Sequence, residues 1–415
     1  PEMPEIAEAQ ALLAALAETD EVKAEIEQRQ RRLQLQTGYA QAVALSRGFL
    51  AEETKAAFER ASELAGHHGG GRERFATNYG RWIVSLTREQ LDDSLRIARE
   101  FLEDAESEGR EMEAAAACRA LGLSHFVAGD FRSARMRLEQ AMRLHNPTND
   151  DESRRMFGFD PQAGAMAYLA CVNLVCGGLS TARELINAAV SRADRFDHLP
   201  TRANAWLFKA FYEAMRGDPE ATLAAADALV AISRLGGLAL YLTCGEACAG
   251  WARARGGDLE AGTEALRRSR DRLREQGGLT LSPFFAGLLA ALEAEGGHLD
   301  DASALIEETL AHAAQTGSHF SDSALQRLRG EILLRRDPVN LAVAEEAFQT
   351  AIAIAKEQGA RSCELLASLS LAKLRQSTGR PAEAYGVLAP ALEGFSPTPE
   401  MPEIAEAMSM ASRLS

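Results

Sequence analysis

The sequence has few aromatic residues, no stretch of alternating Val, Ile and Thr, and no long apolar run. Aromatics make up 6% of the 415 residues, and apolar stretches such as FFAGLLAAL (284–292) are far too short to span a bilayer. These absences disfavour a β-sheet protein and a transmembrane helix. Alanine, leucine, glutamate and arginine dominate instead, which is typical of an all-helical protein.

Lysine is also scarce, and acidic residues outnumber basic ones to give a net charge of −15. None of the five lysines follows a glycine, so the sequence contains no G-x-x-x-x-G-K-[ST] phosphate loop. The glycine-rich stretch GHHGGGRERF (66–75) reads as a loop, and the basic run LRRSRDRLR (266–274) as a solvated helix face. An acidic surface repels phosphate backbones, so we expect no direct nucleic-acid partner and no membrane partner.

Cysteine and histidine form no recognisable metal or catalytic pattern. The six cysteines lie among alanines and leucines in predicted helices, where they read as small buried residues. His67 and His68 are neighbours in a loop and make an incomplete metal site. We therefore expect no cofactor, no metal and no catalytic residues. With no signal peptide visible, a reduced cytoplasm is the expected setting.

What the sequence has is a repeat. An apolar helix, a turn centred on glycine and a second helix with an early alanine recur, as in FVAGDFRSARMRLEQAM (126–142) and ARARGGDLEAGTEALRRS (252–269). The marker residues are Gly129, Gly178, Gly217, Gly257, Gly297, Asp337 and Gly379. Successive markers are 39 to 42 residues apart, except for a first step of 49 that carries an insertion.

Each repeat predicts a helical hairpin. Glycine ends the first helix because it adopts the left-handed conformation at little cost. A small residue four or five places later lets the two helices approach closely; these residues are Ala134, Ala182, Ala221, Ala261, Ala302 and Ala384. A single hairpin cannot bury its apolar stripe, so neighbouring hairpins must stack.

The predicted fold is therefore an all-α, right-handed superhelical solenoid of about nine tetratricopeptide-like hairpins, with a period of about 40 residues. Residues 1–415 form a single solenoid in this interpretation. Its expected parts are a capping helix at 1–18, degenerate repeats at 19–110, regular repeats at 111–395 with an insertion at 145–162, and a C-terminal capping helix at 396–415.

Several segments carry a resemblance to a known family. They are 33–65, the insertion FGFDPQAGAMAYLACVNLVCGG (157–178), LQRLRGEILLRRD (325–337) and residues 351–395. The chain resembles the helical-repeat sensor region of bacterial AAA/STAND-type signal-transduction ATPases, often linked to class III adenylate or guanylate cyclase domains. It is more distantly similar to the helical sensor domain of maltose-type transcriptional activators. The resemblance implies a region that binds a ligand or partner protein and controls enzymatic modules.

The candidate binding residues follow from the expected geometry of stacked hairpins. First helices line the inner groove, where peptides and ligands lie, and aromatic and arginine residues dominate binding hot spots. The candidates are Trp206, Tyr241, Phe284, Arg329, Asn204 and Trp251, within a wider set that includes Tyr79 and Trp82.

The insertion between the first two glycine markers is a second candidate. HNPTNDDESRRMFGFDPQ (145–162) is long for a helix–helix connection, and such loops are often functional. Gly158, Asp160 and Pro161 belong to the resemblance and are candidate regulatory residues. Asp160 followed by Pro161 is equally a good helix start, and that structural explanation is favoured.

Two main functions fit these observations. The first is a non-catalytic sensor or scaffold that binds a protein, a peptide or a small effector in its groove and regulates a signalling enzyme. The second is an architectural module that forms homo-oligomers and leaves the groove empty. An enzyme with an unfamiliar groove site is a third and weaker hypothesis.

The nine residues PEMPEIAEA occur at both 1–9 and 399–407. Each copy can begin a capping helix: Thr398 and Pro399 supply a helix start, and Ile404, Met408 and Ala411 recur at helical spacing. Residues 1–18 fit the C-terminal cap of the resembled family better than 406–415 do. An engineered or misassigned terminus, a true duplication, and a device that links molecules end to end all remain open.

Overall fold

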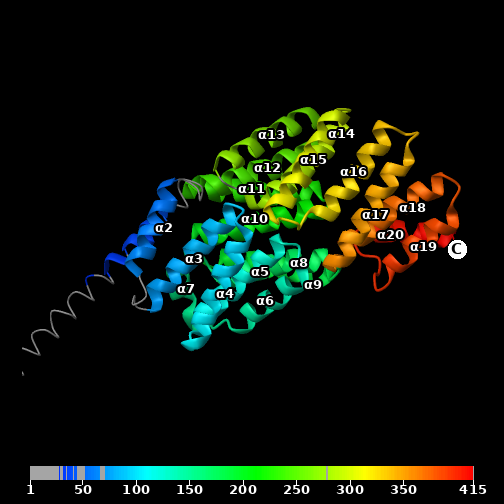
Figure 1. Cartoon of the computed structure of the whole chain (residues 1–415). Helices are drawn as coiled ribbons and strands as arrows, with labels where there is room; N and C mark the ends of the chain where they lie inside the picture. The colour runs from blue at the N-terminus through cyan, green and yellow to red at the C-terminus, as the bar shows by residue number, and fades with distance from the viewer. Residues whose placement is uncertain are drawn as a thin grey trace, which may run out of the picture.

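The computed structural model describes residues 52–65, 71–276 and 279–414, together with residues 28, 31–33, 35–40, 42 and 43. All secondary structure within these residues is helical, and no strand occurs among them. The chain is a solenoid of stacked helical hairpins (Figure 1), as predicted. His67 and His68, residues 1–18 and most of 19–51 lie outside the described residues.

Eight hairpins follow one another from residue 71 to residue 392. They are α3(Gly71–Thr87) with α4(Leu91–Ser107), α5(Glu111–Val127) with α6(Phe131–Arg143), α8(Pro161–Val175) with α9(Leu179–Asp194), α10(Leu199–Met215) with α11(Pro219–Gly236), α12(Ala239–Arg255) with α13(Leu259–Gln276), α14(Ser282–Glu295) with α15(Leu299–Thr316), α16(Asp322–Arg336) with α17(Leu341–Gln358), and α18(Arg361–Ser377) with α19(Pro381–Leu392). The helix α2(Glu52–Ala65) precedes them, and α20(Glu403–Leu414) ends the chain.

Seven of the eight hairpin turns share one geometry; the turn between α16 and α17 does not, because Asp337 there has a φ of −137°. A residue with positive φ ends the turn, and the residue five places later is small and buried where the two helices touch. The pairs are Glu89 and Ser94, Gly129 and Ala134, Gly177 and Ala182, Gly217 and Thr222, Gly257 and Gly262, Gly297 and Ala302, and Gly379 and Ala384. In six of these turns glycine takes the left-handed conformation without the steric cost a Cβ would bring.

This constant spacing corrects three positions from the sequence. The left-handed glycine of the third hairpin is Gly177 rather than Gly178. In the fourth and fifth hairpins the helix contact is made by Thr222 and Gly262, whereas Ala261 is exposed. The sequence pattern preferred alanine at both sites, but the register of the turn selects the next residue.

The insertion is a short helix rather than an irregular loop. The 3₁₀ turn η1(Pro147–Asn149) leads into α7(Asp150–Phe157), whose C-cap Gly158 has a φ of 76°. Asp160 then caps α8, and its side chain accepts a hydrogen bond from Ala163 N at 2.8 Å. The structural explanation of Asp160 and Pro161 as a helix start is therefore present in the fold.

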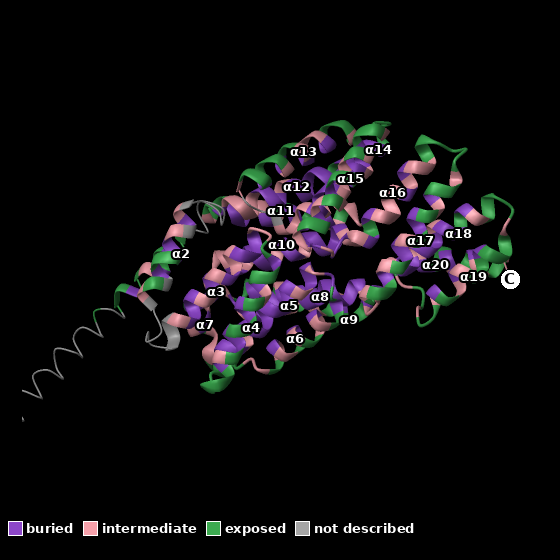
Figure 2. Cartoon of the chain, in the orientation of Figure 1, coloured by how far each residue is buried: buried purple, intermediate pink, exposed green. Residues whose placement is uncertain are grey.

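In most hairpins the first helix is the more buried one. Figure 2 shows α5 and α8 buried along most of their length, whereas α13 alternates between buried and exposed positions. Alanines fill much of these inner helices, so the backbones approach closely. The inner side of the solenoid is consequently packed with side chains.

The superhelix closes on itself. Ser362 Oγ donates to Leu174 O at 2.6 Å, Phe320 N donates to Val127 O at 3.2 Å, and Thr280 Oγ1 lies 3.5 Å from Leu86 O. These partners are 188 to 194 residues apart, which is about five periods of the repeat. Later hairpins therefore stack on hairpins about five positions earlier, so successive turns of the superhelix contact one another.

The C-terminal helix begins later than the sequence suggests. Residues 399–402 form a turn, in which Thr398 Oγ1 accepts from Glu400 N at 3.2 Å, and α20 starts at Glu403. Ile404, Ala407 and Met410 are its fully buried residues. Thr398 is thus a turn residue, not the cap of α20, because residues 399–401 are held against distant helices.

Candidate functional site

An apolar cavity of about 110 Å³ lies between first helices from hairpins on both sides of the superhelical turn. Its lining residues come from α3, α5, α10, α12 and the short turn η2(Leu279–Leu281). They include Ile83, Leu123, Phe208, Tyr241 and Cys244. The position matches the inner face on which the sequence placed the candidate ligand contacts.

A polar cluster adjoins this cavity and is built from the same inner helices. Tyr79 of α3, Arg119 of α5, Tyr168 of α8 and Asn204 of α10 are all buried, with exposed fractions of 1–7%. Arg119 donates to the hydroxyl oxygens of Tyr79 and Tyr168, the latter at 3.3 Å. The Phe208 ring contacts the Tyr168 ring with 4.4 Å between centroids, so the cluster and the cavity share a wall.

Arg119 is buried without an acidic partner. Its guanidinium carbon lies 4.6–5.5 Å from the ring centroids of Tyr79, Trp82, Phe159 and Tyr168. Among the described residues no carboxylate forms an ion pair with it, and its Nε has no hydrogen-bond partner. Cation–π contacts offset part of the desolvation cost, but a buried charge normally also has a counter-charge.

Burial also fixes the protonation of the tyrosines. It raises the pKa of Tyr79 above its ordinary value, although Arg119 acts in the opposite direction. Burial likewise raises the pKa of Tyr241, whereas the nearby Asn204 side chain acts to lower it. Both phenols are therefore neutral at pH 7 and keep a proton to donate.

The insertion covers this cluster. Phe159, which follows the C-cap of α7, is half-buried and packs over the Arg119 guanidinium. Gly164 makes room for it, because a Cβ at this position would come within 2.9 Å of the Phe159 ring. The inserted segment thus links the surface of the molecule to the inner-face cluster.

Asn204 and Tyr241 are the two candidate residues that the structure brings together at this site. They are on successive first helices, and the Asn204 side chain is near enough to the Tyr241 hydroxyl to act on its pKa. Tyr241 also lines the cavity. From the wider set, Tyr79 and Trp82 contribute rings around Arg119.

The other groove candidates lie elsewhere. Trp206 donates to Asp194 of α9 at 3.2 Å, and Arg329 pairs with Glu307 of α15 at 2.6 Å, so both face the second helix of the preceding hairpin. Trp251 is buried within α12. Phe284 packs on Phe211 with 4.4 Å between ring centroids and is not among the residues that line the cavity.

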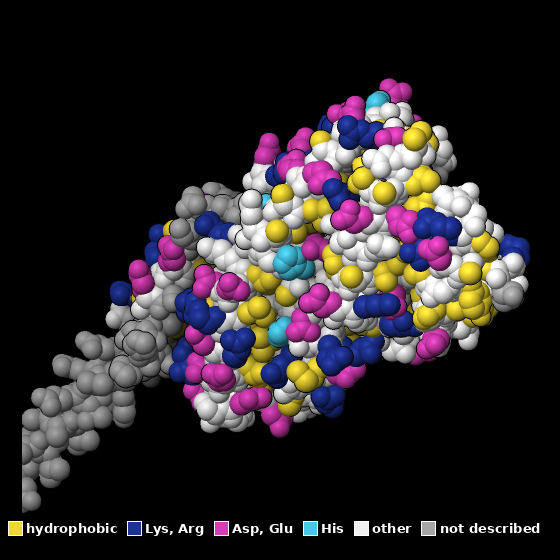
Figure 3. All heavy atoms as spheres, turned by 45° about the vertical axis from the view of Figure 1, so that its right-hand side comes forward, with side chains coloured by type: hydrophobic (Ala, Val, Ile, Leu, Met, Phe, Trp, Pro, Cys, Tyr) yellow, Lys and Arg dark blue, Asp and Glu magenta, His cyan; other side chains and the backbone are white. Residues whose placement is uncertain are grey.

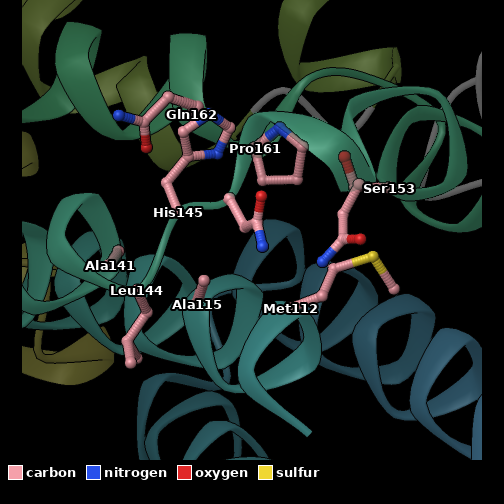
Figure 4. A pocket seen from close by; sticks show the side chains of 10 residues that line it. Met112, Ala115, Ala141, Leu144, His145, Ser153, Pro161 and Gln162 are labelled. Atoms are coloured by element: carbon pink, nitrogen blue, oxygen red, sulfur yellow. The ribbon is translucent and has the colours of Figure 1, made fainter.

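The candidate regulatory residues form a tightly bonded helix start. Asp160 is 1% exposed and pairs with Arg192 at 2.9 Å, while its backbone N–H donates to Thr201. A cavity of about 20 Å³ beside it is lined by residues that include His145, Pro161 and Gln162 (Figure 4). This space holds about one water molecule. Gly158 and Pro161 serve as the cap of α7 and the first residue of α8.

A second charged cluster lies where the chain end meets the middle hairpins. Glu213 of α10 is fully buried and bonds Arg183 at 2.5 Å, Lys209 at 2.8 Å and Arg216 at 2.5 Å. Burial alone would raise its pKa, but these hydrogen bonds outweigh burial and lower the pKa of Glu213 to about 2. Glu400 joins the cluster from the C-terminal segment.

The outer surface carries paired charges of both signs. In the basic run on α13, Arg267, Arg268, Arg272 and Arg274 each contact a glutamate. Figure 3 shows acidic and basic side chains interspersed over the visible face. Among the described residues, no helix has the length and apolar character needed to cross a membrane, and no three His, Cys, Asp or Glu residues gather as metal ligands would.

The sequence interpretation missed Arg119 and Tyr168, for which one local signal existed. Each stands alone as a large polar side chain in an otherwise apolar helix, in AAAACRALGL (114–123) and AMAYLACVNL (165–174). Because most residues of such a helix are buried, an isolated arginine there indicates an unusual environment. The partners of these residues come from hairpins 40 to 49 residues away and could not be assigned from spacing alone.

Comparison with known proteins gives a consistent picture of the fold. No family model matches the sequence. An uncharacterized protein of Rhizobium meliloti (strain 1021) is 22% identical over 342 residues, covering 80% of this chain and 32% of that protein. The chain thus spans about a third of the length of this curated relative.

Solved structures similar to this chain are helical-repeat proteins. A Rap protein complexed with competence and sporulation factor has a TM-score of 0.59 and 11% identity, covering 93% of this chain and all of the Rap chain. A tetratricopeptide repeat protein from Parabacteroides merdae ATCC 43184 covers 77% of this chain, with 13% identity and a TM-score of 0.36. The likeness to the Rap chain agrees with the all-helical repeat solenoid of this structure.

Proposed function

We propose that this chain is a non-catalytic sensor region that binds a peptide, a protein segment or a small effector at its inner face. The observation that carries the proposal is the buried Arg119 cluster, whose donors lack acceptors, beside an apolar cavity built from the same helices. Such a cavity with a few convergent polar groups is typical of ligand sites. The Rap protein of similar fold was solved with a bound factor, which is consistent with ligand binding by this architecture.

The proposed consequence of binding is regulation of a signalling enzyme in the cytoplasm. The sequence resemblance to sensor regions of AAA/STAND-type ATPases and their linked cyclases supports this role. The closed superhelix offers a mechanism, because a ligand between α3, α5, α10 and α12 contacts hairpins from both sides of the turn. Binding would favour one spacing of these hairpins, and an attached or partner enzyme would respond to that spacing.

A cavity-filling variant tests whether the inner face binds a ligand. A low-molecular-mass extract of the source cells is added to the purified protein, and the melting temperature is measured for the wild type and for Cys244→Leu. Cys244 lines the cavity and is 4% exposed, so leucine fills part of the space. Cys363→Leu on α18, outside the residues lining the cavity, is the matched control. We expect the wild type and the control to be stabilised and Cys244→Leu to respond little.

Equal responses of all three proteins, or no response in any, would contradict the proposal. If the wild type is stabilised, the extract is fractionated. The ligand in the active fraction is then identified by mass spectrometry after the complex is denatured.

The architectural alternative has one observation in its favour. In the C-terminal copy of the repeated nonapeptide, Glu400 is held by Arg183 and Arg216 of the middle hairpins. Residues 1–9 have the same sequence and could dock on the same cluster in a second molecule. This candidate function is self-assembly through terminal segments, and it does not require a ligand at the inner face.

A further inference from the structure

The chemistry of the inner-face cluster restricts the chemical class of ligand that the site can bind. We infer that Arg119 receives a carboxylate of the ligand, while the adjoining cavity takes a small branched or ring-shaped apolar group. This inference rests on the proposed ligand-binding function and adds the chemical class of the ligand. Three observations support it: hydrogen-bond donors exceed acceptors around Arg119, no carboxylate among the described residues pairs with Arg119, and the apolar cavity adjoins the cluster.

Donors exceed acceptors around Arg119. Its two terminal nitrogens donate to Tyr79 and Tyr168, but its Nε–H has no acceptor among the described residues. Each phenol oxygen accepts from Arg119, and no described residue accepts the proton of either hydroxyl. Three of the five guanidinium N–H groups and both phenol O–H groups therefore lack an acceptor among the described residues. A buried donor without a partner destabilises the site, so this arrangement favours a ligand that brings acceptor oxygens.

The charge leads to the same class of ligand. Arg119 is 1% exposed, and its neighbours within the cluster are aromatic rings, phenols and the Asn204 amide, all of them neutral. The other buried charged clusters of the molecule, at Glu213 and Asp160, contain both signs. A carboxylate supplies the missing sign, and a planar guanidinium binds it with good geometry.

The apolar part of the ligand follows from the adjoining cavity. Leu123 lies one turn after Arg119 on α5, and Ile83 lies one turn after Tyr79 on α3, so the cluster and the cavity adjoin along both helices. A cavity of about 150 Å³ accommodates benzene, so 110 Å³ holds about four or five carbon atoms. The ligand thus combines a carboxylate with a side chain of about leucine size.

Two sources share this chemistry, namely the C-terminal residue of a peptide and a free short-chain acid. N-acetyl-L-leucine and 4-methylpentanoate represent them, and the corresponding primary amides are the uncharged controls. Binding is measured at pH 7 by calorimetry with the full chain. A charge-assisted hydrogen bond in a buried site predicts that each acid that binds does so about tenfold or more tightly than its amide.

The variants separate recognition from folding. Arg119→Met keeps the apolar bulk and removes the unpaired charge, so it should fold and lose the preference for acid over amide. Arg119→Lys keeps the charge without the planar fork and should retain a reduced preference. Arg132→Gln removes an exposed arginine of α6 as a matched change in net charge, and it should behave as the wild type.

The outcomes are decisive in both directions. Tighter binding of N-acetyl-L-leucine identifies a peptide end as the source, and tighter binding of 4-methylpentanoate identifies a free acid. Equal binding of acid and amide, undetectable binding of both acids, or an acid preference that survives in Arg119→Met would overturn the inference. The proposed function is judged separately, because the response of Cys244→Leu to the extract does not depend on a carboxylate.

Discussion

Two buried charges in this molecule show opposite ways of tolerating burial. Glu213 is surrounded by Arg183, Lys209 and Arg216, so its charge is compensated within the protein. Arg119 has only aromatic rings and phenols around it. A group satisfied by its neighbours stabilises the fold, whereas one left without a counter-charge costs stability and is expected to serve binding. The neighbours of each buried charge therefore distinguish the structural cluster at Glu213 from the proposed binding cluster at Arg119.

The pH dependence of stability tests the role of Glu213. Its pKa is lowered from 4.5 to about 2 in the folded protein. A lowered folded pKa contributes stability that is fully present above the unfolded value and is lost as pH falls toward the folded value. The shift corresponds to roughly 3 kcal/mol at pH 7. We expect Glu213→Gln to lose about this much free energy of unfolding at pH 7, measured by urea denaturation.

The gap between wild type and Glu213→Gln should shrink as the pH falls from 5 to 3. Glu220→Gln on the exposed side of α11 is the control and should change little at any pH. A gap that stays constant over this range would show that Glu213 acts by packing rather than by its charge.

Individual site residues could be predicted only in part. Asn204 and Tyr241 are polar residues on first helices, and the stacking rule places first helices at the inner face. The same rule also selected Trp206 and Arg329, which face the preceding hairpin, because the rotation of each side chain about the helix axis depends on packing with its neighbours. Arg119 could not be predicted as a site residue, because that prediction needs knowledge of which hairpins surround it.

At the scale of the element, one turn geometry repeats through the chain. In seven of the eight hairpins, the left-handed residue and the small residue five places later keep the two helices in the same relation. In the fifth hairpin both contacting positions, Gly250 and Gly262, are glycines. A Cβ on Gly262 would approach Ala254 N to 2.4 Å and Gly250 O to 2.6 Å. Backbone atoms cannot move aside as a flexible side chain can.

Substitution of Gly262 tests this close approach. Gly262→Ala must push α12 and α13 apart, and overpacking of this kind costs about 1–3 kcal/mol despite the better helix propensity of alanine. Gly386→Ala on α19 is the matched control, because no atom lies within 4 Å of the place its added methyl group would take, and it should stabilise by up to about 1 kcal/mol. Denaturation midpoints of the two variants should shift in opposite directions. Equal shifts would mean that the hairpin tolerates a wider spacing.

At the scale of the whole molecule, the repeat predicted the solenoid but not its closure. The period of about 40 residues and the glycine turns follow from local sequence, so the hairpins could be placed in advance. Closure depends on the small rotation between neighbouring hairpins, which accumulates over about five of them until Leu174 meets Ser362. That rotation is set by the packing of many side chains and has no short sequence signature.

The repeated nonapeptide bears on this closure. Arg216 donates to the backbone carbonyls of Pro399 and Glu400 at 3.0 Å and 3.2 Å, and Arg183 binds the Glu400 carboxylate. Met401 and Ile404 are buried. All four of these residues of the C-terminal segment have identical counterparts in residues 1–6, which lie outside the described residues. The N-terminal copy therefore has the side chains needed to compete for this docking site.

Competition between the two copies predicts how self-association should respond to mutation. The C-terminal copy is tethered beside its site, at an effective concentration of about millimolar, so a second molecule displaces it poorly. Glu400→Ala weakens only the tethered copy, and we expect it to increase association measured by sedimentation velocity over a range of concentrations. Adding Glu2→Ala to Glu400→Ala weakens both copies and should reverse the increase. If deletion of residues 1–9 leaves the hydrodynamic size of Glu400→Ala unchanged at every concentration, the terminal copies do not link molecules.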